Sequence, residues 1–140
     1  MLSQPIGSLE GTAKVVSVPL QTSVADAAAL MSTNRVSAVL VVEGGEIVGI
    51  CTERDIVYRV IAPGRDPSRV PVGEAMTHDP LTADPDTLLG RALVVMHDRG
   101  VRHLPIVREG KAVGMVCARD ALDPELEEFI CEEIRRRSYR

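Results

Sequence analysis

The chain has 140 residues and a formal net charge of −4, with 45% hydrophobic but only 2% aromatic residues. Its core must therefore be largely aliphatic. A nucleic-acid surface needs basic groups for phosphates or rings for base stacking, so this composition argues against one. The three cysteines have no C-x-x-C spacing, and neither a signal peptide nor a membrane-spanning run is evident. We expect a cytoplasmic protein with no membrane partner.

The first half of the chain predicts alternating strands and helices. In chain order the predicted elements are a strand over residues 15–18, a helix from Ser23 to about Thr33, strands over 37–42 and 46–51, and a helix from Thr52 to about Ile61. Ser23 and Thr52 are each followed three residues later by an aspartate, Asp26 and Asp55, which predicts a capping box at both helix starts. Gly44–Gly45 predicts the turn between the two later strands.

The second half predicts the same order of elements. They are a strand near residues 81–83, a helix from Thr87 to about Arg99, strands over 102–107 and 111–117, and a short helix from Ala118. A further helix is expected from Asp123, where proline and an acid follow an N-cap residue. Its apolar stripe is a candidate contact for a second copy, or a cover for its own chain.

The two halves are an internal repeat. Residues 22–55 align with residues 87–120 without a gap, so that 48–55 (VGICTERD) falls on 113–120 (VGMVCARD). Pro5–Gly7 matches Pro71–Gly73 one residue out of that register. Because a unit of this size buries little surface alone, we expect the copies to pack on each other around a shared cleft. The predicted boundaries are 5–62 and 71–122 for the repeats, 63–70 for a linker and 123–140 for the last helix.

The β-α-β-β-α order and the two segments Gly49–Asp55 and Gly114–Asp120 resemble the CBS domain family, whose tandem pairs are known as Bateman modules. The resemblance covers residues 5–122. It implies an α+β fold of two pseudo-symmetric CBS repeats packed sheet to sheet, followed by the C-terminal helix. It also implies a homodimer and a regulatory ligand containing adenosine, of the AMP, ADP, ATP or S-adenosylmethionine type.

The resemblance also implies two ligand sites. The last aspartate of each motif, Asp55 or Asp120, would hold the ribose hydroxyls. The remaining residues implied for the first site are Val15, Ser37, Ala38, Val39, Thr52 and Arg54, and those for the second are Pro80, Arg102, His103, Leu104, Pro105, Cys117 and Arg119. A carboxylate at a helix start can accept hydrogen bonds from vicinal hydroxyls, each worth about 1.5–3 kcal/mol when one partner is charged.

The second motif departs from the family pattern. Cys117 stands where threonine or serine is expected, and a thiol is a weak donor and acceptor. Leu40 in the first half also corresponds to Pro105 in the second. We therefore expect two non-equivalent sites, with the first as the better nucleotide site.

Three functions remain open from the sequence. The first is a sensor that binds an adenosine nucleotide and signals to a separate, unknown protein. The second is a ligand-free module for dimerisation or docking, in which Thr52 and Asp55 only cap a helix. The third is a redox-responsive protein acting through Cys117. No catalytic motif, metal-ligand spacing or catalytic cofactor site is evident, so we expect no enzyme.

Overall fold

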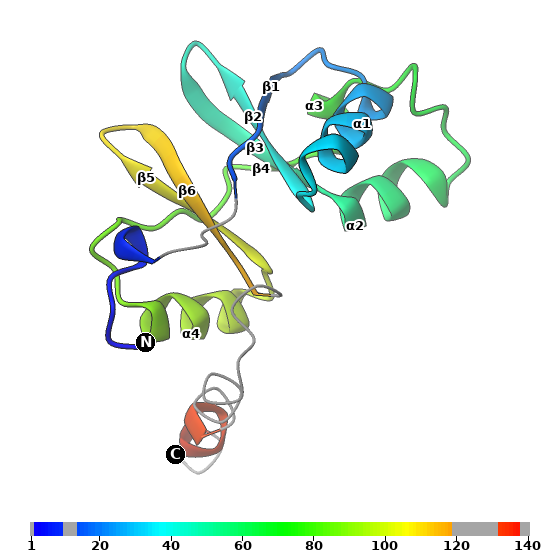
Figure 1. Cartoon of the computed structure of the whole chain (residues 1–140). Helices are drawn as coiled ribbons and strands as arrows, with labels where there is room; N and C mark the ends of the chain where they lie inside the picture. The colour runs from blue at the N-terminus through cyan, green and yellow to red at the C-terminus, as the bar shows by residue number, and fades with distance from the viewer. Residues whose placement is uncertain (1, 10–13, 119–131, 138–140) are drawn as a thin grey trace. The chain divides into compact units, whose positions relative to one another are not determined.

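The structure is a computed structural model that describes residues 2–9, 14–118 and 132–137. The chain forms two compact units (Figure 1). One unit contains residues 14–81 and 109–112, which include most of the first repeat. The other contains residues 1–13, 82–108 and 113–140, which include most of the second repeat. Among the described residues, no helix is long and apolar enough to cross a membrane.

The unit of the first repeat contains a four-stranded sheet in the order β1-β2-β3-β4. Its strands are β1 (Ser17–Pro19), β2 (Ala38–Glu43), β3 (Glu46–Thr52) and β4 (Thr77–His78). β1 runs parallel to β2, whereas β2 pairs with β3 and β3 with β4 antiparallel. Gly44 and Gly45 join β2 to β3 with φ angles of 59° and 81°, which glycine adopts without strain. The predicted turn is confirmed.

Three helices accompany this sheet. They are α1 (Val24–Asn34), α2 (Glu53–Ile56), which continues as the π-helical segment η2 (Val57–Ile61), and α3 (Val72–Ala75). The Oγ atom of Ser23 accepts the Asp26 N–H at 3.0 Å, which confirms Ser23 as the N-cap of α1, but the reciprocal bond of the predicted capping box is not formed there. The predicted helix from Thr52 to Ile61 is confirmed in extent, although its second half has π-helical hydrogen bonding.

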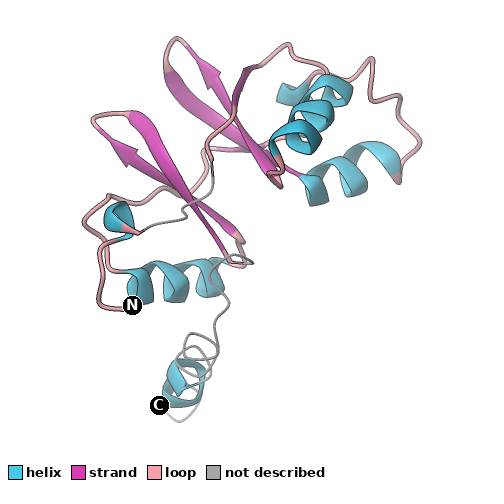
Figure 2. Cartoon of the chain, in the orientation of Figure 1, coloured by secondary structure: helices cyan, strands magenta, loops and turns pink. Residues whose placement is uncertain are grey.

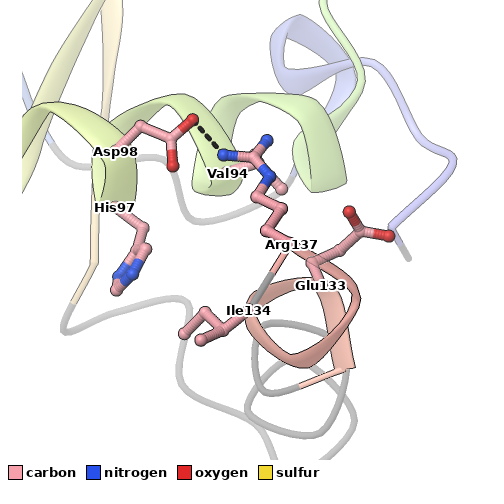
Figure 3. A pocket seen from close by; sticks show the side chains of 6 residues that line it. All are labelled: Val94, His97, Asp98, Glu133, Ile134 and Arg137. Atoms are coloured by element: carbon pink, nitrogen blue, oxygen red, sulfur yellow. Dashed lines mark hydrogen bonds and ion pairs between the residues drawn. The ribbon is translucent and has the colours of Figure 1, made fainter. Parts of the chain in front are cut away.

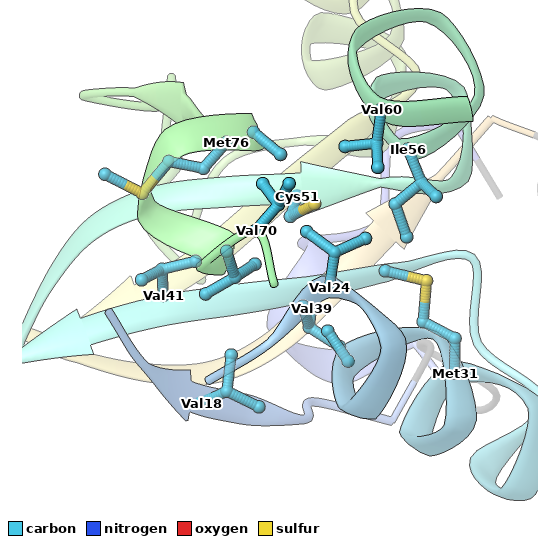
Figure 4. Packing of buried hydrophobic residues seen from close by; sticks show 13 residues of the cluster. Val18, Val24, Met31, Val39, Val41, Cys51, Ile56, Val60, Val70 and Met76 are labelled. Atoms are coloured by element: carbon cyan, nitrogen blue, oxygen red, sulfur yellow. The ribbon is translucent and has the colours of Figure 1, made fainter. Parts of the chain in front are cut away.

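The core of this unit lies between one face of the sheet and the helices (Figure 4). Val39, Val41 and Cys51 come from that sheet face and are completely buried. The helices and the segment before α3 contribute Val24, Ala27, Met31, Ile56, Val60, Val70, Val72 and Ala75. Leu40 and Ile50, on the opposite face, are buried as well. Burial of both faces explains why β2 is an unbroken apolar run rather than an alternating one.

The unit of the second repeat has the same plan with fewer strand pairs (Figure 2). Its elements are the short 3₁₀ helix η1 (Ile6–Ser8), α4 (Leu89–Arg99), β5 (His103–Arg108) and β6 (Lys111–Cys117). The strand predicted near residues 81–83 is reduced to one parallel bridge between Ala83 and Ile106. The helix predicted from Thr87 starts two residues later, because Leu88 is still extended.

Two Pro-x-Gly segments each pack against the first helix of the other repeat. In one unit Val72 and Gly73 donate backbone hydrogen bonds to Thr22 and Leu20, at 2.7 and 3.1 Å. In the other unit, at the matching repeat positions, Ile6 donates to Thr87 at 2.8 Å and Gly7 to Pro85 at 2.9 Å. The repeat in the sequence is therefore matched by a repeat in the hydrogen bonding. Because each segment packs against the other repeat and not against its own, we call Pro5–Gly7 and Pro71–Gly73 the exchanged segments.

The residues that precede these two segments in the chain satisfy the first N–H groups of the helices. Val24 and Ala25 of α1 donate to the carbonyls of Val70 and Pro67, at 2.8 and 2.9 Å. Leu89 and Gly90 of α4 donate to Gln4 and Leu2, both at 2.9 Å. The first N–H groups of a helix have no partner inside it, so the residues that lead into the exchanged segments cap α1 and α4.

Candidate functional site

The residues predicted for the first ligand site lie at one edge of the four-stranded sheet, which we call the Thr52 edge. β3 ends at Thr52 directly opposite Ala38, where β2 begins. Val15 precedes β1, and the next residue, Val16, accepts a backbone hydrogen bond from Leu40 at 2.9 Å. Because β1 and β2 are parallel and β3 is antiparallel to β2, these chain positions meet at the same edge. The structure therefore brings the predicted positions together.

Thr52 and Asp55 form the predicted capping box. The Asp55 N–H donates to Thr52 Oγ1 at 3.1 Å, and the Thr52 N–H donates to Asp55 Oδ2 at 3.0 Å. The Glu53 N–H, also in the first turn, donates to the carbonyl of Ser37 at 3.0 Å. The start of α2 is thus fixed by both side chains of the motif and by the beginning of β2.

The Asp55 carboxylate is held from two directions. Its side chain is only 12% exposed, and Oδ1, the oxygen not used in the capping box, lies 3.8 Å from Nε of Arg59. Arg59 Nη1 in turn donates to the carbonyls of Met76 at 2.8 Å and Ala75 at 3.4 Å. Arg59 was not among the predicted site residues. Its position four residues after Asp55 on a predicted helix was the signal that could have identified it.

The other residues predicted for this site differ in how they meet solvent. Arg54 is exposed, and its guanidinium lies over the ring of Tyr58, 5.8 Å from the centroid. Val15 and Ser37 are half-buried at the edge. Ala38 and Val39 are buried, and Val39 belongs to the core. A ligand at this edge could therefore contact Val15 and Ser37 but not Val39, which is completely buried.

The residues predicted for the second site are only partly described. Arg102 is exposed and His103 half-buried at the start of β5, whereas Leu104 and Pro105 are buried. The Ala118 N–H donates to the carbonyl of Arg102 at 2.9 Å, which repeats the bond from Glu53 to Ser37. Pro80 is half-buried after β4, in the unit of the first repeat. Arg119 and Asp120 lie outside the described residues.

The two described cysteines are buried. Burial, and to a smaller extent the nearby Asp55 carboxylate, raise the pKa of the Cys51 thiol to about 12 against the opposing effect of Arg59. Cys117 is 8% exposed at the end of β6. Both thiols therefore lack the solvent access that reactive cysteines have. In the described part of the chain, no three His, Cys, Asp or Glu side chains are grouped to hold a metal ion.

A shallow pocket lies elsewhere, between α4 and the helical residues 132–137 (Figure 3). Its lining consists of Val94, His97, Asp98, Glu133, Ile134 and Arg137. Arg137 donates a hydrogen bond to Asp98, which is the main cause of a lowered Asp98 pKa. The pocket contains none of the predicted ligand residues. Of the apolar stripe predicted for the last helix, Leu126, Phe129 and Ile130 lie outside the described residues.

Comparison with known proteins identifies the class. The family model of the CBS domain matches residues 6–62 and 72–125. The chain is 37% identical over 109 residues to the CBS domain-containing protein YhcV of Bacillus subtilis, covering 78% of this chain and 77% of that protein. The chain therefore belongs to the CBS domain family and carries two tandem copies of the domain. As a CBS pair, it is a regulatory module.

Solved structures agree with this assignment. A protein from Pyrococcus horikoshii has a TM-score of 0.78 and 36% identity, with 86% of this chain and 90% of that chain covered. The CBS domain protein PAE2072 from Pyrobaculum aerophilum, complexed with AMP, has a TM-score of 0.76 and 22% identity. That match covers 92% of this chain and 98% of the other. At this identity the second likeness shows a common fold alone.

Proposed function

We propose that this chain binds an adenosine-containing nucleotide at the Thr52 edge and signals its presence to a separate protein, without being an enzyme. The observation that carries the proposal is the Asp55 carboxylate. It lies at a helix start on the edge where Val15, Ser37 and Thr52 meet, and its Oδ1 atom is not used in the capping box. Such an oxygen can accept hydrogen bonds from ribose hydroxyls. The AMP complex of the Pyrobaculum protein supports AMP as the first compound to test.

The binding would regulate a partner only if the nucleotide favours one arrangement of the protein over another. We propose that the regulated protein is a different polypeptide and that the module itself is a homodimer. The first repeat has an exposed apolar group after α2, formed by Val57, Tyr58 and Ile61, which are 49%, 65% and 53% exposed. This group supports self-association, which light scattering coupled to size exclusion would measure.

The ligand-free docking module is the second candidate, and one observation favours it. Oδ2 of Asp55 is engaged by the Thr52 N–H, and Oδ1 lies beside Arg59. The carboxylate therefore has a sufficient structural role without a ligand. A crystal grown without added nucleotide separates the two candidates, because adenine-shaped density at the Thr52 edge would support binding and a site filled by protein side chains would support docking.

Isothermal titration with AMP, ADP, ATP and S-adenosylmethionine tests the proposed function, after a thermal-shift screen of the same compounds. We expect Asp55→Asn to weaken the best ligand by at least about tenfold, because asparagine can still accept the Thr52 N–H but carries no charge for the hydroxyls. Asp26→Asn is the matched control, since it removes the same charge from the same position of α1. Equal affinities in both variants would remove Asp55 from the site. If the wild-type protein bound none of the four compounds, the ligand-free docking module would be the remaining candidate.

A further inference from the structure

We infer that Arg59 is a positioning residue for the Asp55 carboxylate and gives the Thr52 edge its preference for ribose over deoxyribose. This inference rests on the proposed function. It concerns a residue outside the Gly49–Asp55 motif, on the π-helical segment that follows α2.

The two oxygens of the Asp55 carboxylate have separate roles in the structure. Oδ2 accepts the Thr52 N–H at 3.0 Å and is committed to the capping box. Oδ1 faces Arg59 Nε at 3.8 Å, a distance typical of an ion pair rather than of a hydrogen bond. Arg59 therefore supplies positive charge beside Oδ1 without using its lone pairs, which remain available to hydroxyl donors.

That counter-charge matters because Asp55 has little contact with water. Its side chain is 12% exposed before any ligand arrives, and a sugar lying over it would remove most of the remaining water. A carboxylate without water is costly unless a cation lies close to it. With Arg59 beside it, the carboxylate keeps a cationic partner under a bound ribose and can form charge-assisted hydrogen bonds, which are roughly twice as strong as neutral ones.

Arg59 is itself held in place by a distant part of the chain. Its Nη1 atom donates to the carbonyls of Met76 and Ala75, where α3 ends. The last carbonyls of a helix have no partner inside it, and a cationic donor suits them. The Met76 side chain packs against Gly49, since a Cβ added at Gly49 would lie 2.2 Å from its sulfur. The guanidinium is therefore anchored to the sheet whose edge carries Asp55.

The test compares AMP with 2′-deoxy-AMP by isothermal titration and uses the ratio of their affinities. We expect the wild-type protein to prefer AMP by about ten- to a hundredfold, the value of a hydrogen bond to a charged group. Arg59→Gln should lower this preference about tenfold, because the desolvated carboxylate loses its partner. Arg59→Lys should lower it by about threefold, because an ammonium cannot contact Asp55 and both carbonyls as a guanidinium does.

Arg65→Gln is the matched control. Arg65 follows the same helical segment and pairs with Glu74 at 3.7 Å, so the variant removes the same charge without touching Asp55. The Arg65→Gln variant should prefer AMP over 2′-deoxy-AMP by the same factor as the wild-type protein. A purely structural role for Arg59 would weaken AMP and 2′-deoxy-AMP equally, so an unchanged ratio in Arg59→Gln overturns the inference. If that variant does not fold, an unchanged ratio in Arg59→Lys does so.

The failure of this inference can be distinguished from the failure of the proposed function. A wild-type protein that binds neither these two compounds nor ADP, ATP or S-adenosylmethionine overturns both. A wild-type protein that binds both compounds equally removes the contact between Asp55 and the 2′-hydroxyl, and with it the role of Arg59, while adenosine binding itself remains.

Discussion

The two repeats share a backbone but differ in the side chains at the end of their last described strand. In both, the residue after that strand donates a hydrogen bond to the start of the neighbouring strand, from Glu53 to Ser37 at 3.0 Å and from Ala118 to Arg102 at 2.9 Å. At the strand end, however, the first repeat has Thr52 in a capping box and the second has a buried Cys117. A duplicated scaffold can thus keep its main-chain bonds while its site chemistry diverges.

The difference between the repeats also extends to their helix starts and exchanged segments. Gly7 and Gly73 occupy matching positions, but they face different neighbours, Pro85 and Leu20. Each difference can be tested by changing one repeat and using the other as its reference. The expected effects on the free energy of unfolding are largest for the packed glycines, smaller for the capping box at Thr52, and smallest for the residues at the ends of α1 and α4.

The largest effect on stability is expected when Gly7 or Gly73, the glycines of the exchanged segments, is replaced by alanine. A Cβ at Gly7 would lie 2.6 Å from Pro85 Cβ and 3.0 Å from its carbonyl oxygen, whereas at Gly73 the closest atom, at 2.8 Å, is Cδ2 of Leu20. A proline ring and its backbone cannot move aside as the end of a leucine can. We expect Gly7→Ala to lower the free energy of unfolding by about 1–3 kcal/mol, and Gly73→Ala to lower it by less.

Hydrogen exchange followed by mass spectrometry would show where each glycine acts. Gly7→Ala should reduce the protection of α4, and Gly73→Ala that of α1, because each segment donates to the residues just before that helix. Loss of protection in the opposite helix would contradict the exchanged arrangement. Gly64→Ala is not a suitable control, since Gly64 has a φ of 80°.

A smaller effect is expected at the helix start that distinguishes the two motifs. Thr52→Val removes Oγ1, the acceptor of the Asp55 N–H, and keeps the shape of the side chain. We expect a loss of about 1 kcal/mol in the free energy of unfolding, the usual contribution of an N-cap. Thr52→Cys, which copies the second repeat, should lose nearly as much, because sulfur is a weak acceptor.

Thr33→Val is the control for these variants, because Thr33 is an exposed threonine within α1. Denaturant unfolding of all three proteins gives the comparison. If Thr52→Val costs no more than Thr33→Val, the capping box contributes nothing measurable, and the divergence at Cys117 then has no consequence for stability.

The sequence pattern was sufficient for elements fixed by local chemistry. The capping box at Thr52, the turn at Gly44–Gly45 and the strand over residues 111–117 are all confirmed, because helix caps, glycine turns and apolar runs act over a few residues. The strand expected near residues 81–83 was wrong except for the single bridge at Ala83, because pairing depends on a distant partner. β4 was missed for the same reason.

For the candidate site, the sequence predicted the motif but not its surroundings. The spacing of Thr52 and Asp55 predicts their mutual hydrogen bonds, which need only one helical turn. The contact of Arg59 with Met76 depends on where α3 returns after the linker, and no local pattern encodes that return. The burial of Val39 likewise follows from which face of β2 the helices cover.

The smallest effects are expected from exchanging cap residues between α1 and α4. Leu88 has nearly the backbone conformation of Ser23, with φ and ψ of −71° and 142° against −65° and 149°, yet it provides no side-chain cap. In Leu88→Ser the new hydroxyl could accept the Arg91 N–H, as Ser23 accepts that of Asp26. We expect a gain of about 0.5–1 kcal/mol, measured by denaturant unfolding. A loss would mean that the exposed Leu88 side chain stabilises the protein through packing instead.

At the C-terminal ends of the two helices, α4 has the more favourable cap residue and α1 the less favourable one. The C-cap residue after α4 is Gly100, with a φ of 65°, whereas that after α1 is Arg35, with a φ of 54°, where a Cβ is unfavourable. Arg35→Gly relieves that strain but adds flexibility to the unfolded chain, so the expected gain is only about 0.5 kcal/mol. Gly100→Arg should cost at least as much. If both changes stabilised the protein, left-handed geometry would not be what limits these positions, and the two repeats would differ for a reason outside their helix ends.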